Sequence, residues 1–112
     1  MLIYKVFRVR EWNALAGTGE TVGAPIDRSD GFIHFSTAEQ LRETVAKHFA
    51  DIPGLVLAAV DTESLGDDLK WEVSRGGDKF PHLYRKLKLS EVVHHAPLKE
   101  LDGVHLFPDE IP

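Results

Sequence analysis

The first third of the chain contains two apolar segments of different periodicity. Residues 2–9 are rich in Ile, Tyr, Val and Phe, which predicts a strand. Residues 12–16 place apolar side chains at spacings of three and four, which predicts a short helix ended by Gly17 and Gly19. Residues 20–30 contain glycine, proline and a Ser-Asp pair followed by glycine, so we expect a polar loop there.

The best local signal surrounds a second predicted helix. A short strand over residues 31–36 leads into two overlapping capping boxes, Ser36 with Glu39 and Thr37 with Gln40. Either box satisfies two main-chain N–H groups at a helix N-terminus. The apolar face of the helix then follows at Ala38, Leu41, Val45 and Phe49, before Pro53–Gly54 ends it.

The second half of the chain is mostly strand-like. Residues 55–60 form an unbroken apolar run, which predicts a central strand covered on both faces. Residues 69–74 alternate, which predicts a half-buried strand with Leu69, Trp71 and Val73 inward and Glu72 on the opposite face. Further strands are expected within residues 80–98.

These elements predict an α+β fold. We expect a single compact domain over residues 1–112, with a twisted, largely antiparallel sheet and two helices from the N-terminal half. A chain of 112 residues buries about two-thirds of its surface on folding, which is enough for one core and too little for two domains.

Composition excludes several classes of protein. No apolar run approaches the roughly 20 residues of a membrane span, and charges interrupt the first apolar segment, so we expect no membrane association and no signal peptide. Cysteine is absent, which excludes disulfides and thiolate sites and fits a cytoplasmic location. The net charge of −5 argues against long nucleic acids as partners. The sequence does not indicate an oligomeric state.

One basic segment stands out in this acidic chain. Within residues 75–88, five positive side chains are opposed only by Asp78: Arg75, Lys79, Arg85, Lys86 and Lys88. Such a segment can hold a small anion, or it can be a solvated strand edge protected by lysines.

Three short segments place a titratable side chain among aromatic residues, a setting enriched at functional sites. His34 stands two residues before the helix cap, so its ring is expected at a helix N-terminus, suited to a phosphate or a ribose oxygen. Glu72 is a general base if its strand face lines the same cleft, and a surface carboxylate otherwise. His82 and Tyr84 share a face, which offers an aromatic surface to a planar ring or forms a packed corner.

We therefore interpret two residues as candidate catalytic groups and six as candidate ligand-binding groups. The catalytic candidates are Glu72 and His82. The ligand-binding candidates are His34, Ser36, Thr37, Tyr84, Arg75 and Arg85. No metal site is expected, because these residues lack short ligand spacing and no H-E-x-x-H pattern exists. Walker, G-x-G-x-x-G and G-x-S-x-G motifs are also absent.

The three segments together resemble a known family. Gly-Phe-Ile-His-Phe-Ser-Thr at 31–37, Lys-Trp-Glu at 70–72 and Phe-Pro-His-Leu-Tyr at 80–84 are similar to the bacterial family catalogued as domain of unknown function 952. The resemblance covers nearly the whole chain. It implies a compact, distant relative of the ADP-ribosyltransferase superfamily, with NAD as a possible ligand. It further implies that His34 contacts the NAD ribose, that Tyr84 stacks on nicotinamide, and that Glu72 or His82 orients the reacting ribose.

Three hypotheses about function follow. The chain binds a nucleotide or similar small phosphate-bearing ligand in an ADP-ribosyltransferase-like cleft. Alternatively, it catalyses NAD-dependent ADP-ribosyl transfer or NAD glycohydrolysis, or it is a protein-interaction domain without a small-molecule site. Whether His34, Glu72 and His82 meet within hydrogen-bond reach is the most direct structural test.

Overall fold

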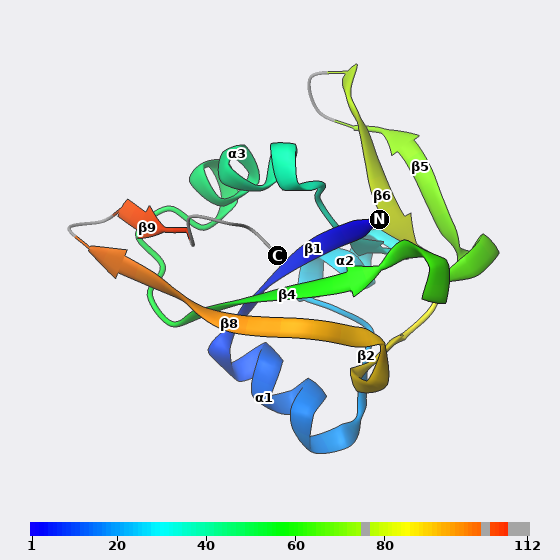
Figure 1. The fold of residues 1–112 in the computed structure, drawn as a ribbon, viewed down its shortest axis with the longest axis horizontal. Helices are drawn as coiled ribbons and strands as arrows, with labels where there is room; N and C mark the ends of the chain where they lie inside the picture. The colour runs from blue at the N-terminus through cyan, green and yellow to red at the C-terminus, as the bar shows by residue number, and fades with distance from the viewer. Residues whose placement is uncertain (75–76, 102–103, 108–112) are drawn as a thin grey trace.

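A curled antiparallel sheet forms the centre of the fold in the computed structural model, which describes residues 1–74, 77–101 and 104–107. The strand order is β1 (Leu2–Arg8), β4 (Leu55–Asp61), β8 (Val92–Leu101) and β9 (Val104–Leu106), each antiparallel to its neighbour (Figure 1). The apolar run of β4 lies between β1 and β8 and is buried from Leu55 to Val60, as the sequence predicts. The α+β prediction is confirmed.

Two apolar clusters cover the two faces of this sheet. Because side chains alternate along a strand, Ile3 and Phe7 of β1 enter one cluster, whereas Tyr4 and Val6 enter the other. The first cluster includes Leu15 of α1 (Val9–Thr18). The second includes Leu41 and Val45 of α3 (Ala38–His48). Helices α1 and α3 accordingly lie on opposite sides of the sheet in Figure 1.

Of the two capping boxes in the sequence, the Thr37–Gln40 box forms. Thr37 is the N-cap of α3, and its Oγ1 accepts a hydrogen bond from the Gln40 main-chain N–H at 3.2 Å. The Gln40 side chain in turn accepts from the Thr37 main-chain N–H at 3.0 Å. Helix α1 ends at Gly19, whose φ of 86° is readily adopted by glycine, while Gly17 lies inside the helix.

A third helix, α2 (Pro25–Asp30), occupies part of the segment expected to be a polar loop, so that prediction was wrong. Pro25 is at the first helical position and Gly31 caps the other end with a φ of 86°, the usual places of these residues at helix ends. The preceding residues form β2 (Glu20–Thr21), which pairs with β7 (Leu87–Lys88). Residues 20–30 therefore form a strand and a helix, and the helix packs beside β1.

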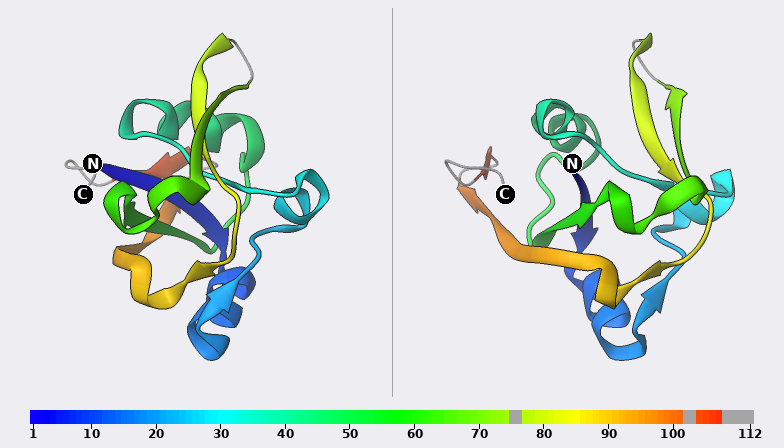
Figure 2. Two further views of the ribbon diagram at one scale, coloured as in Figure 1. Left: turned by 90° about the vertical axis from the view of Figure 1, so that its right-hand side faces the viewer. Right: turned by 45° about the vertical axis from the view of Figure 1, so that its right-hand side comes forward.

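A second antiparallel sheet extends away from the main one (Figures 1 and 2). Its strand order is β3 (Ile33–His34), β6 (Lys79–Leu83) and β5 (Leu69–Val73). Trp71 and Val73 are 39% and 65% exposed, so their predicted inward orientation was wrong. The hairpin reaches beyond the core, so Trp71 and Val73 stay exposed on this face of β5. Glu72, on the other face, is half-buried.

Short 3-10 segments complete the described connections. Two of them, η1 (Thr62–Ser64) and η2 (Gly66–Asp68), join β4 to β5, and η4 (Leu89–Glu91) precedes β8. No helix within the described ranges is both long and apolar enough to cross a membrane.

Candidate functional site

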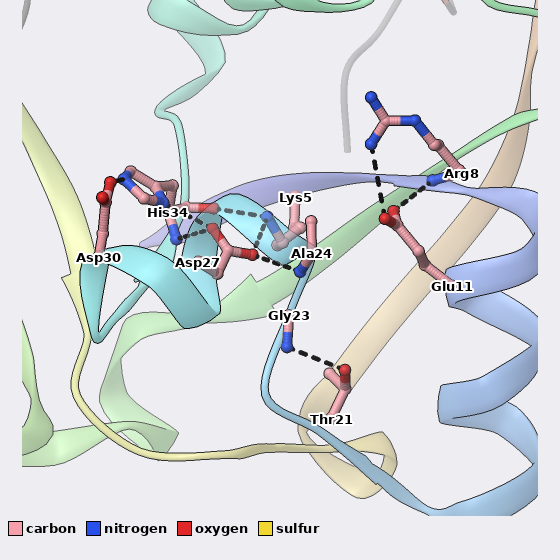
Figure 3. Close-up of polar contacts among 9 residues, drawn as sticks. All are labelled: Lys5, Arg8, Glu11, Thr21, Gly23, Ala24, Asp27, Asp30 and His34. Carbon is pink, nitrogen blue, oxygen red and sulfur yellow. Dashed lines mark hydrogen bonds and ion pairs between the residues drawn. The ribbon is translucent and has the colours of Figure 1, made fainter.

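Asp27 of α2 is the centre of a buried polar network (Figure 3). Its Oδ2 accepts a hydrogen bond from the Ala24 main-chain N–H at 2.7 Å and forms an ion pair with Lys5 Nζ at 2.9 Å. Its Oδ1 accepts from the His34 main-chain N–H at 3.1 Å and lies 2.5 Å from Nδ1 of the His34 ring. Four partners therefore hold a carboxylate that is fully removed from solvent.

The ionised form of Asp27 is strongly favoured. Burial by itself would raise the pKa of this carboxyl, but the hydrogen bond from His34 and the charge and hydrogen bond of Lys5 outweigh it. The pKa falls from 3.8 to about 2. Lys5 is itself buried and also donates from Nζ to the His34 carbonyl at 3.1 Å, so its charge has two partners. The network thereby joins β1, α2 and β3.

The His34 ring lies between two carboxylates of α2. Asp27 contacts Nδ1, and Asp30 Oδ2 lies 3.0 Å from Nε2. The sequence predicted that this ring faces a helix N-terminus, and that prediction was wrong. The side chains of α2, which the sequence did not predict, occupy both ring nitrogens.

A second histidine-carboxylate pair lies on the inner face of the β5–β6 hairpin. Nδ1 of the buried His82 is 2.8 Å from Glu72 Oε1, and the Tyr84 hydroxyl donates to the same oxygen at 2.6 Å. The hydrogen bond from Tyr84, followed by the one from His82, lowers the pKa of Glu72. The bond to Glu72 conversely raises the pKa of the Tyr84 hydroxyl. Nδ1 of His82 is thus occupied, and among the described residues no hydrogen bond reaches its Nε2.

Phe32 connects the two networks. Its ring stacks on His82 with centroids 4.1 Å apart, and it also contacts His34 at 4.7 Å and Tyr84 at 5.2 Å. The two imidazole rings meet edge to face at 5.3 Å. Glu72 and His82 are thus within hydrogen-bond reach, with His34 in adjacent ring contact. The structure brings His34, Glu72, His82 and Tyr84 into one cluster.

A pocket of about 480 Å³ opens beside this cluster. It is bounded by β1, α2, α3 and β6, and its lining includes Lys5, Asp27, His34, Ser36 and His82. A second pocket of about 420 Å³ shares Asp27 and is lined by Phe32, Tyr84 and Arg85. The predicted site residues are therefore divided between two neighbouring cavities. Glu72 lines neither cavity and contacts Nδ1 of His82.

The remaining candidates have other contacts. Ser36 lines the larger pocket and its Oγ lies 3.0 Å from Thr44 Oγ1, whereas Thr37 uses its hydroxyl to cap α3. Arg85 pairs with Glu91 at 2.7 Å and with Asp68 at 3.1 Å.

The predicted basic segment is consequently less available to an anion than its sequence indicates. Lys86 also has a carboxylate partner, Glu20 at 3.1 Å. Arg75 lies outside the described residues.

Sequence reasoning missed Lys5, Asp27 and Asp30. One usable signal was Lys5 itself, because a lysine inside the apolar run of a strand needs a buried partner. Another was Asp27 two residues after Pro25, the position from which a carboxylate caps a helix N-terminus. Within the described ranges, no three His, Cys, Asp or Glu side chains are grouped so as to hold a metal ion.

Comparisons with known proteins agree with one another. A family model described as "Protein of unknown function (DUF952)" matches residues 6–95. The chain is similar to protein CC0527 from Caulobacter crescentus, whose crystal structure has 51% sequence identity and a TM-score of 0.90 and covers 95% of this chain and 94% of that chain. The solution NMR structure of the same protein has 53% identity and a TM-score of 0.82, with 92% and 90% covered. No curated protein matches the chain.

Proposed function

Because the chain belongs to the DUF952 family of proteins of unknown function, we propose a function from the site alone: binding of a small phosphate-bearing ligand, such as a nucleotide, in the larger pocket. One observation carries the proposal. His82, held at Nδ1 by Glu72, lines the same cavity as the partly exposed Arg8. Its volume of about 480 Å³ is within the range of about 300–1,000 Å³ that small-molecule sites occupy.

Arg8 is the best candidate to bind the phosphate. It lines the pocket, its guanidinium lies 5.2 Å from the centre of the Phe49 ring, and 42% of its side chain is exposed. Its contact with Glu11 is 3.5 Å long, whereas Lys5 and Arg85 have shorter carboxylate contacts (Figure 3 shows Arg8 and Lys5). A guanidinium presents paired donors that match phosphate oxygens.

The Glu72–His82 pair favours a second candidate function, a reaction on the bound ligand that requires a proton acceptor. With NAD, Nε2 of His82 would take the proton of a water molecule or an acceptor hydroxyl whose oxygen bonds to ribose C1′. The bond from C1′ to the nicotinamide nitrogen breaks, and nicotinamide leaves. Water as the nucleophile gives ADP-ribose, and an acceptor hydroxyl gives its ADP-ribosyl product.

A thermal-shift panel with inorganic phosphate, AMP, ADP-ribose and NAD tests ligand binding, because a bound ligand raises Tm by mass action. We expect at least one phosphate compound to raise Tm by several degrees. Arg8→Gln should weaken that ligand at least tenfold, and Arg10→Gln, an exposed arginine two residues away, should leave its affinity unchanged. A panel without any shift would refute ligand binding and favour a protein-interaction domain.

Chromatography of NAD incubated with the chain separates the two candidates. Release of nicotinamide that is lost in His82→Asn and retained in His94→Gln, an exposed histidine of β8, would support catalysis. NAD binding without any release would leave the binding function alone.

A further inference from the structure

The outer edge of β1 borders the larger pocket and has a gap in its hydrogen bonding. In an antiparallel pair, alternate residues direct both main-chain groups toward the neighbouring strand. Tyr4 points away from β4, because its N–H and C=O both pair with Ser36, at 2.8 and 2.9 Å. Arg8, four residues later, also points away and donates its N–H to Glu11 Oε1 at 2.9 Å.

Val6 lies between these two residues and therefore directs its N–H and C=O to the same edge. Neither group has a partner anywhere in the described part of the chain. Val6 is nevertheless only 6% exposed, and it lines the larger pocket. Buried main-chain groups almost always have a hydrogen-bond partner. For Val6 that partner must come from solvent or from a molecule bound in the pocket.

We propose that the main chain of Val6 binds the planar amide-type edge of the ligand, in which a carbonyl acceptor stands next to an N–H donor. The Val6 N–H donates to the ligand carbonyl, and the Val6 C=O accepts from the ligand N–H. The edge of uracil or guanine and a primary carboxamide share this chemistry. The inference rests on the proposed function and specifies the head group of the ligand.

The short length of the gap favours a small head group. An added peptide strand would use alternate residues of β1, but Tyr4 and Arg8 already have partners, so a strand would gain a single residue pair. Ile26, Leu41 and Phe49 line the same pocket and offer apolar contact to a flat group.

The position of Arg8 fits the same ligand. It lies two residues from Val6, or about 7 Å along the strand. A head group on Val6 and a phosphate on Arg8 can therefore belong to one molecule of nucleotide size.

Amide spectra of the ¹⁵N-labelled chain test this inference with matched probes. One pair is uridine monophosphate and its N3-methyl derivative, and the other is nicotinamide and N,N-dimethylnicotinamide. We expect one parent probe to move the Val6 amide proton downfield, and its methylated partner to bind at least tenfold more weakly. The pair that responds identifies nucleobase or carboxamide as the source.

The outcomes distinguish this inference from the proposed function. If uridine monophosphate or inorganic phosphate raises Tm and shifts the amides around Arg8, while the Val6 amide stays still and methylated probes bind equally well, the Val6 inference is overturned alone. If a compound of the thermal-shift panel binds but no parent probe does, the Val6 inference is again overturned alone. If neither the panel nor these probes bind, both proposals are overturned.

Discussion

Replacing Asp27 with asparagine is expected to lower the free energy of unfolding by about 3–5 kcal/mol, the usual cost of removing one member of a buried ion pair. The carboxylate is fully buried and has four partners. The amide is uncharged, so the buried ammonium of Lys5 would lose its counter-charge. The NH₂ group of the amide would also face one of the hydrogen-bond donors that the carboxylate now accepts from. The consequence should be a large loss of stability from a change of one atom.

The pH dependence of stability gives an independent magnitude. The pKa of Asp27 is lower in the folded chain, about 2, than the ordinary value of 3.8, so folding favours the ionised carboxylate. This contribution is complete above the unfolded pKa and is lost as the pH falls through the folded pKa. It amounts to roughly 2–3 kcal/mol, lost between about pH 5 and pH 2.

Urea denaturation followed by tryptophan fluorescence and circular dichroism measures both effects, at pH 7 and at steps down to pH 2.5. Asp67→Asn, which makes the same change at an exposed position, should alter stability by less than about 0.5 kcal/mol. In a double-mutant cycle with Lys5→Met, the combined variant should lose less than the sum of the single losses. A loss below about 1 kcal/mol in Asp27→Asn, with an unchanged acid profile, would refute the role assigned to this network.

Three further variants test other local contacts. Gly23→Ala should destabilise the chain by about 2 kcal/mol in urea denaturation, because Gly23 has a φ of 94° and an added Cβ would overlap with the Asp27 carboxylate. Gly17→Ala, inside α1 with open space around it, should instead stabilise by about 0.5–1 kcal/mol, and equal losses would contradict the argument. Glu72→Gln should lower the pKa of Tyr84 toward its ordinary value in an ultraviolet titration, and an unmoved titration would show that their hydrogen bond does not persist in solution.

Much of the local structure could be predicted from neighbouring residues. The capping box at Thr37 determines where α3 begins, because donor and acceptor lie three residues apart. The apolar run of β4 predicts a central strand, because every side chain needs a covered face. Helix α2 is hard to predict because its proline and its capping glycine are typical of loops as well as of opposite helix ends.

The candidate site was predictable only in part. Aromatic surroundings single out His34, Glu72, His82 and Tyr84 in the sequence, and these residues meet around Phe32 in the structure. Their orientations were not predictable, because each depends on contacts between distant segments.

By itself the sequence determined the periodicities, the helix caps, the absence of cysteine and the clustering of aromatic and titratable residues in three segments. Only the tertiary structure decided which charges are buried and which are paired. Lys5 and Asp27 are 22 residues apart, yet they form a buried ion pair because α2 packs beside β1. Within the described residues, the main chain of Val6 lacks a partner because the pairing with Ser36 is made at Tyr4 and α1 begins only at Val9. Electrostatic and hydrogen-bond partners are set by distances in space, which local sequence patterns do not encode.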